Sequence, residues 1–252
     1  MALISRGNSK RARALRLFSL SLFRPTPHFI AIPSLGIAYG RVPKVGNSAI
    51  KRTLAHGAGL QGRFPNKGFS KDRNWKTLAP DAYFVDAGTL RRDFPELLVF
   101  AFVREPLSRL ASCYRSKLTE GRTIGKGLAQ EGLKTGISFP DFVDHVCRRG
   151  DWRSNVHYRS QSSILSSFAP DRNGSTPAMI GRFETMHRDW ARISEAVEAR
   201  TGRPLPRLPH RNPKHKIATA EDFFQGDAAL TARAAARYAE DYRLFYPGQA
   251  PS

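Results

Sequence analysis

The segment from Ile37 to Ala55, IAYGRVPKVGNSAIKRTLA, constrains the fold more than any other part of the chain. The apolar run Ile37–Val42 predicts a β-strand that ends at Pro43, and a helical pattern begins at Ala49. The residues between them, Lys44–Ser48, predict a tight turn. Such a turn points free backbone N–H groups and the positive end of a helix dipole at one spot, which suits phosphate or sulfate.

Three residues of this turn have the chemistry of an anion site. Gly46 lets the backbone approach a ligand closely, Lys44 adds a mobile positive charge, and Ser48 is expected to cap the helix and to bond an oxyanion. The nucleoside-triphosphatase loop is excluded, because it needs a longer glycine-rich stretch that ends in Gly-Lys-Ser/Thr. A plain strand–turn–helix joint with a solvated lysine remains the alternative.

A second strand–loop–helix unit lies at Leu97–Leu118. Its first part, Leu97–Val103, is continuously apolar and predicts a buried strand of a parallel sheet. Arg104 follows the strand, Pro106 suits the first turn of a helix, and Ser112 lies on that helix. Ligands of open α/β sheets bind at the carboxyl ends of strands, so Arg104 and Ser112 can converge on a second anion. The alternative is an ion pair of Arg104 with a nearby acid.

The charge distribution is strongly uneven. The chain of 252 residues has a formal net charge of +20, and thirteen of its 41 Lys and Arg residues precede the first acidic residue, Asp72. This balance attracts polyanions and keeps a nucleic-acid-binding protein as one alternative, although no recognition motif is present. A kinase-like phosphotransferase is the other, but it needs a Mg²⁺-holding acid near the loop, and neither Asp72 nor Asp86 lies in such a motif.

Strand and helix patterns alternate, which predicts an α/β fold with a central, mainly parallel sheet flanked by helices. We expect a basic tail at residues 1–28 and one domain at residues 29–248. Gly59–Lys76 is expected to be irregular. The predicted strands are Phe29–Ile32, Ile37–Val42, Leu97–Val103 and Ala178–Phe183, and the predicted helices are Ser48–His56, one that starts at Pro106, Ser138–Arg149, Thr185–Arg200 and Asp227–Phe245.

The two anion-binding units together resemble a known family. The segment RVPKVGNSAIKRTL resembles the 5′-phosphosulfate loop of the carbohydrate sulfotransferases that modify chondroitin, dermatan and related glycans. The segment FAFVREPLSRLASCYRSKL resembles their 3′-phosphate segment, with Arg and Ser eight residues apart. Three weaker blocks, HYRSQ, IGRFETMHRDW and YAEDYRLFYPG, extend the resemblance to roughly Ile30–Pro247.

This resemblance implies a nucleotide-binding, P-loop-like sulfotransferase fold and the donor 3′-phosphoadenosine 5′-phosphosulfate (PAPS), with no metal. Lys44 would contact the bridging and sulfonate oxygens, and the 5′-phosphate would be wrapped by Val45, Gly46, Asn47 and Ser48. Arg104 and Ser112 would hold the 3′-phosphate. His157 matches the family's histidine and is the candidate base for the acceptor hydroxyl, although Tyr158 and Ser160 replace the Trp and Pro that usually surround it.

The resemblance also implies a carbohydrate acceptor. The basic surface suits an anionic polysaccharide, while a lipid-linked sugar and a small molecule stay open, and Gly59–Lys76 and Gly202–Lys216 are the candidate acceptor loops. No apolar run approaches the roughly 18 residues that span a bilayer, and Cys113 and Cys147 form no disulfide framework. We therefore expect a bacterial-type cytoplasmic enzyme, with peripheral membrane contact through its basic N-terminus as a further option and no nucleic-acid partner.

Overall fold

The protein folds around a five-stranded sheet of order β3-β1-β2-β4-β5. The computed structural model describes residues 27–60, 62–64, 68–165, 168, 178–209 and 219–251. The strands are β1 Phe29–Ile32, β2 Ile37–Gly40, β3 Tyr83–Val85, β4 Leu98–Val103 and β5 Ala178–Arg182. The predicted α/β class is confirmed, with four of these strands at or within one to two residues of their expected bounds.

The expected mainly parallel sheet is correct for only part of the structure. Strands β2, β4 and β5 are parallel, whereas β1 pairs antiparallel with both β2 and β3. The connection between β1 and β2 is the short 3-10 turn Pro33–Leu35 followed by Gly36 with φ 65°. Such a short connection permits only an antiparallel pair, because a parallel pair needs a long crossover.

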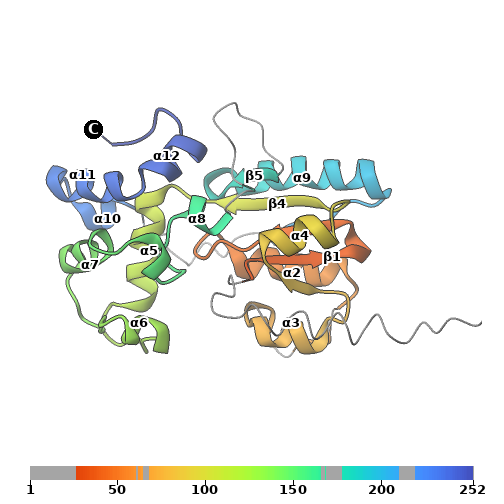
Figure 1. Cartoon of the computed structure of the whole chain (residues 1–252), viewed down its shortest axis with the longest axis horizontal. Helices are drawn as coiled ribbons and strands as arrows, with labels where there is room; N and C mark the ends of the chain where they lie inside the picture. Colours follow the sequence, from red (N-terminus) through yellow and green to blue (C-terminus); the bar gives the residue numbers. More distant parts are fainter. Residues whose placement is uncertain are drawn as a thin grey trace, which may run out of the picture.

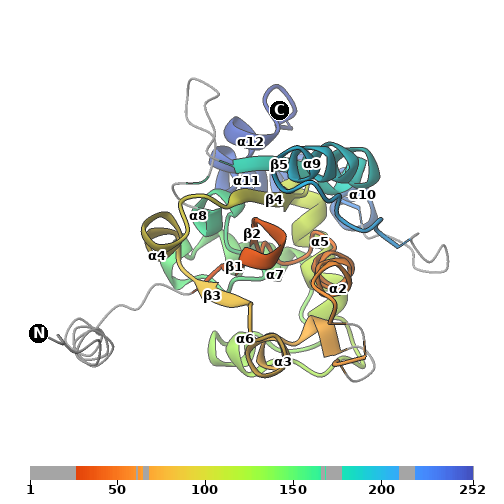
Figure 2. The same ribbon diagram turned by 90° about the vertical axis from the view of Figure 1, so that its right-hand side faces the viewer.

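Helices cover both faces of the sheet (Figure 2). On one face lie α2 (Asn47–Gly57) and α9 (Met186–Thr201), and on the other lie α4 (Ala87–Asp93) and α8 (Gln161–Leu165). The remaining helices include a group that gathers beyond the carboxyl end of β4 (Figure 1). This group consists of α5 Pro106–Lys117, α6 Lys126–Gln130, α7 Phe139–Cys147, α10 Glu221–Phe224, α11 Ala228–Arg237 and α12 Ala239–Phe245. Helix α3, Asp72–Leu78, lies apart from it, below α2.

Two predictions about local structure are wrong. Of the stretch expected to be irregular, Gly59–Lys76, the last five residues belong to α3 (Asp72–Leu78), whose Trp75 is fully buried. The terminal helix expected at Asp227–Phe245 is divided at Tyr238 into α11 and α12. The buried hydroxyl of Tyr238 donates to the carbonyl of Tyr158 at 2.6 Å. Asp241 of α12 accepts bonds from the N–H groups of Gln161 and Ser162 at the start of α8, both at 2.8 Å.

The core is built around β4, whose six residues are all buried. The rings of Phe100 and Phe102 pack against Trp190 of α9, at centroid distances of 5.9 and 6.3 Å. One cluster of buried apolar residues extends from Phe29 to Tyr246. The predicted tail lies almost wholly outside the described residues, and the predicted division into a tail and one domain stays a prediction. Within the described ranges, no helix is long and apolar enough to cross a bilayer.

Candidate functional site

The loop between β2 and α2 has a backbone that few residues other than glycine adopt. Lys44 has φ 75° and Gly46 has φ 86°, both in the left-handed region. A Cβ atom on Gly46 would lie 2.6 Å from the Cε atom of Met186. The loop therefore needs glycine at position 46 both for its conformation and for its packing against α9.

The start of α2 differs from the sequence expectation. Gly46, not Ser48, is the N-cap residue, and within the described structure no side chain caps this helix. The N–H groups of Ala49 and Ile50 bond to the carbonyl of Gly46, at 2.9 and 3.2 Å. The first N–H groups of α2 are thus left without a side-chain acceptor, which is the arrangement that binds anions at helix N-termini.

The amino group of the half-buried Lys44 is held by a hydrogen bond. Its Nζ donates to the hydroxyl of Ser116 on α5 at 2.6 Å. Burial lowers the pKa of Lys44 from 10.5 to about 8, and the positive charges of Lys117, Arg104 and Arg109 add to this effect. Its hydrogen-bond partner is a neutral hydroxyl, so the charge of the lysine remains available to an anionic ligand. Sequence reasoning missed Ser116, although it lies one helical turn beyond Ser112 on the same helix.

Arg104 is fixed at the end of β4 by the side-chain amide of Gln161. The backbone N–H of Arg104 donates to Oε1 of Gln161 at 2.9 Å, and Nε2 of Gln161 donates back to the Arg104 carbonyl at 2.8 Å. The guanidinium lies over the ring of Phe183 at 4.7 Å and reaches to 3.5 Å from the carbonyl of Lys44. Burial lowers the pKa of Arg104 to about 10, against the opposing effect of nearby acids.

Ser112 lies half-buried on α5. Among the described residues, no hydrogen bond joins its hydroxyl to Arg104. The structure therefore brings Arg104 next to Lys44 and leaves Ser112 on the adjoining helix. Convergence of Arg104 and Ser112 on one anion stays a prediction.

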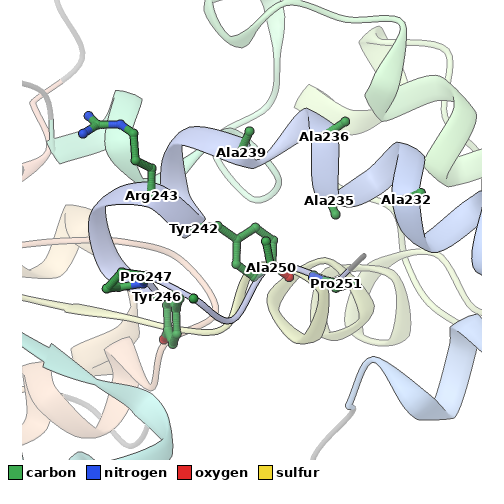
Figure 3. Close-up of a pocket in the computed structure, with 11 residues that line it drawn as sticks. Ala232, Ala235, Ala236, Ala239, Tyr242, Arg243, Tyr246, Pro247, Ala250 and Pro251 are labelled. Atoms are coloured by element: carbon green, nitrogen blue, oxygen red, sulfur yellow. The ribbon is translucent and has the colours of Figure 1, made fainter.

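The C-terminal residues hold the carboxylates on either side of Arg104. Glu105 caps α5 by accepting from the N–H groups of Leu107 at 3.0 Å and Ser108 at 2.6 Å. The hydroxyl of Tyr242 donates to Glu105, and the hydroxyl of Tyr246 donates to Glu184 at 2.9 Å. Figure 3 shows Tyr242 within α12 and Tyr246 directly after it, where both line a separate cavity of about 430 Å³ that contains none of the predicted site residues.

Arg109 connects the turn Lys44–Ser48, which is called the anion loop because the sequence predicts an anion site there, to the segment that carries His157. Its side chain is 1% exposed. The Nε atom donates to the carbonyl of Pro43 at 2.9 Å, and the two terminal nitrogens donate to the carbonyls of Arg159 at 2.8 Å and Val156 at 3.1 Å. One guanidinium thus joins the residue before Lys44 to the residues on both sides of His157.

His157 and the anion loop line one cavity. This cavity has a volume of about 270 Å³ and is lined by His28, Arg41, Pro43, Asn47, Ser48, Lys51, Asp72, Val156 and His157. Burial, with the positive charges of Lys117, Lys44 and Arg109, lowers the pKa of His157 from 6.5 to about 4. Its Nδ1 atom lies 2.8 Å from the side-chain oxygen of Asn155. The neutral imidazole has a ring nitrogen that can accept a proton, and a nearby bound anion would raise its pKa toward the ordinary value.

The cavity contains residues that sequence reasoning missed. His28 lines it as well, and burial with the charges of Arg41 and Arg159 lowers its pKa to about 4. On the wall formed by α2 and α3, Asp72 pairs with Arg41 and, at 2.7 Å, with Lys51. His28 lies in the predicted basic tail, where no motif marks it, so only the fold could place it beside His157.

Tyr158 and Ser160, the two departures from the family's usual histidine block, are both buried and bonded. The hydroxyl of Tyr158 donates to Glu131, and the backbone N–H of Ser160 donates to Asp151 at 2.9 Å. These contacts hold in place the segment that follows His157. Within the described residues, no group of three or more His, Cys, Asp or Glu side chains is arranged so that it could hold a metal ion.

Comparison with known proteins agrees with this geometry. A family model described as the sulfotransferase family matches residues 27–247. Carbohydrate sulfotransferase 8 of Homo sapiens is 27% identical over 231 residues, which are 83% of this chain and 53% of the relative. Carbohydrate sulfotransferase 14 of Homo sapiens is 24% identical over 237 residues, which are 87% of this chain and 60% of the relative. The chain thus spans little more than half the length of these relatives. No solved structure matches it with comparable significance.

The packing of Gly46 is tested by a matched pair of substitutions. Gly46→Ala and Gly59→Ala both place a side chain at positive φ, which costs about 1–2 kcal/mol, but nothing lies within 4 Å of a Cβ on Gly59. We expect Gly46→Ala to lower the free energy of unfolding by about 1–3 kcal/mol more than Gly59→Ala, because the methyl group overpacks against Met186. Urea unfolding measures both, and equal losses would contradict this account of the loop.

The role of Arg109 in stability is tested by Arg109→Leu. The substitution removes the donor from three half-buried carbonyls, and an unsatisfied group costs about 1–3 kcal/mol where it is cut off from water. We expect the free energy of unfolding to fall by about 3 kcal/mol or more, whereas Arg188→Leu, at a side chain 77% exposed, leaves it close to the wild-type value. Similar urea midpoints for the two variants would show that Arg109 does not connect these segments.

Proposed function

Because the chain belongs to the sulfotransferase family, we propose that it transfers a sulfuryl group from PAPS to a hydroxyl of a carbohydrate. The observation that carries this proposal is that three features lie close together in the structure. They are the buried amino group of Lys44, the uncapped start of α2 and the neutral imidazole of His157, which lines the same cavity as Asn47 and Ser48. Transfer of a sulfuryl group to a hydroxyl requires positive charge around the leaving group and, beside it, a group that accepts the hydroxyl proton.

The donor nucleotide fits the residues around the loop. Lys44 would contact the bridging and sulfonate oxygens, and Val45, Gly46, Asn47 and Ser48 would surround the 5′-phosphate with backbone N–H groups. Two features support this: Gly46 allows close approach of the backbone, and the present partner of Lys44 is a neutral hydroxyl. Arg104 and Ser112 would hold the 3′-phosphate, with Phe183 keeping the guanidinium in place.

We propose an in-line displacement without a covalent enzyme intermediate. The acceptor oxygen attacks sulfur while the bond from sulfur to the phosphate oxygen breaks. His157 takes the hydroxyl proton, and Lys44 with the loop N–H groups stabilises the negative charge that grows on the leaving phosphate. Arg109 sets the positions of the lysine loop and the histidine segment relative to each other. Lys44 and the N–H groups supply the positive charge, so we propose that no metal is needed.

The nature of the acceptor is proposed from the relatives and the charge. Two relatives are carbohydrate sulfotransferases by name, and a net charge of +20 favours an anionic polysaccharide over a neutral one. We further propose that the enzyme works in the cytoplasm, with contact to anionic membranes through residues 1–28. The concentration of basic residues before Asp72 supports the proposed membrane contact.

Calorimetric titration of 3′-phosphoadenosine 5′-phosphate, the desulfated product, tests the function directly. In buffer with EDTA we expect wild type to bind it with micromolar affinity and ATP to give no signal. Arg104→Ala should raise Kd about tenfold or more, because a charge-assisted contact with the 3′-phosphate is lost. A folded wild type that does not bind the nucleotide would overturn the proposal, and salt-dependent RNA binding in its place would favour the nucleic-acid alternative.

The role of Lys44 is tested by kinetics with Lys44→Ala. We expect kcat to fall on the order of 100-fold or more, as for the loss of one donor to a developing oxyanion. Ser116→Ala is the matched control, because it removes the present partner of Lys44 and leaves the charge. A Lys44→Ala enzyme with the wild-type kcat would reject this mechanism.

The role of His157 is tested by the pH dependence of kcat/KM. His157 must be neutral and Lys44 charged, so their pKa values of about 4 and about 8 predict a plateau between these limits. The rate falls at lower pH as His157 is protonated and at higher pH as Lys44 loses its proton. His157→Ala should lower kcat about 100-fold or more and remove the acid limb.

The control for His157 is His28→Ala, in the same cavity and with a similarly lowered pKa. We expect His28→Ala to keep both kcat and the acid limb. If only His28→Ala lowered kcat and removed the acid limb, the proton acceptor would be His28 and not His157.

A further inference from the structure

A second cavity lies along α2, beyond the one that contains His157. It has a volume of about 280 Å³ and is lined by Arg52, Thr53, His56, Gly62, Phe69, Arg207 and Pro209. It shares no lining residue with the cavity at His157. We call it the Arg52 groove.

The lining of the Arg52 groove has one sign of charge. Arg52 and Arg207 carry permanent positive charges, and the imidazole of His56 can donate a hydrogen bond. Among the described residues that line the groove, none carries a carboxylate. The guanidinium of Arg52 lies 5.8 Å from the ring centroid of Phe69, which also lines the groove. Cations beside an aromatic face suit a ligand that has both carboxylate or sulfate groups and apolar C–H surface.

The backbone segments that carry the side chains of the groove are held in place by burial and by hydrogen bonds. Leu205 and Leu208 are each 6% exposed, so Arg207 lies on the outer side of an anchored segment. The indole of Trp190 donates to the carbonyl of Pro206 at 3.0 Å. On the opposite wall, the indole of Trp75 donates to the carbonyl of Phe69 at 2.8 Å. A groove held in this way is ready for a ligand without large rearrangement.

The helix α2 connects the groove to the anion loop. Ser48, Arg52 and His56 are spaced by four residues and therefore lie on one face of the helix. At 1.5 Å per residue, Ser48 and His56 are about 12 Å apart along the axis, which is more than one sugar ring spans. Both cavities are bordered by α2 and by the chain around α3, which lies below α2 in both views (Figures 1 and 2).

We propose that the Arg52 groove is a second saccharide subsite, which holds an acidic sugar of the acceptor chain while a more distant sugar lies at His157. The proposal rests on the proposed function, because it assumes a carbohydrate acceptor at the first cavity. It narrows the substrate class to anionic oligosaccharides of several sugars. Arg52 and Arg207 would bind the acid groups, and Phe69 would face the ring.

Binding of size-defined oligosaccharides to the full chain tests the subsite. The probes are unsulfated chondroitin disaccharide and octasaccharide, with maltooctaose as a neutral control of the same length. We expect wild type, saturated with 3′-phosphoadenosine 5′-phosphate, to bind the chondroitin octasaccharide at least about tenfold more tightly than either other probe. Arg52→Ala with Arg207→Ala should abolish this preference, whereas Arg188→Ala should keep it.

The nucleotide titration separates the two proposals. If the double variant binds 3′-phosphoadenosine 5′-phosphate like wild type but has lost the octasaccharide preference, the subsite is supported. If the double variant and Arg188→Ala bind the octasaccharide equally, the subsite is overturned. A wild type that binds the nucleotide but prefers maltooctaose, or prefers single-stranded RNA through the same arginines, also overturns it. Failure of wild type to bind the nucleotide overturns the proposed function itself.

Discussion

The site depends on the hydrogen bonds that the guanidinium of Arg109 makes. The guanidinium lies in the interior and bonds to carbonyls of three residues, Pro43, Val156 and Arg159. Arginine has a planar fork of donors that cannot be deprotonated, so it can satisfy several carbonyls at fixed angles. An apolar side chain of similar size would leave these half-buried carbonyls without this donor. The distance between the anion loop and His157 is therefore set by one side chain from a third segment.

Neutral partners for buried cations give this region its electrostatic character. Lys44 bonds to a hydroxyl and Arg109 to carbonyls. Neither contact supplies the negative charge that usually accompanies a buried cation. The protein bears this cost in the absence of ligand, and a bound anion would relieve it. The lowered pKa values of Lys44 and His157 have the same origin, since burial and the neighbouring cations disfavour a further positive charge.

Local sequence patterns were sufficient to predict much of the fold. They did not predict which distant parts of the chain pair with each other. The apolar run that became β4 and the helix cap at Ser138 are readable because each depends on neighbouring residues. The pairing of β1 with β3 and the break at Tyr238 depend on distant contacts, as does the partnership of Gln161 with Arg104. The same division holds at the site. Lys44 and Gly46 stand out in the sequence, whereas Ser116, Arg109 and His28 become noticeable only when the fold brings them to the loop.

The contact between α12 and α8 has a consequence for the order in which the chain matures. Asp241 holds the first N–H groups of α8, and Gln161 of that helix fixes the backbone of Arg104. The end of β4 therefore has its full set of contacts only when residues separated by 80 positions have met. Such distant contacts form late, because long loops must close first. During synthesis on the ribosome, the anion loop can emerge and begin to fold early, but the site as a whole is completed only after residues up to Tyr246 have left the exit tunnel.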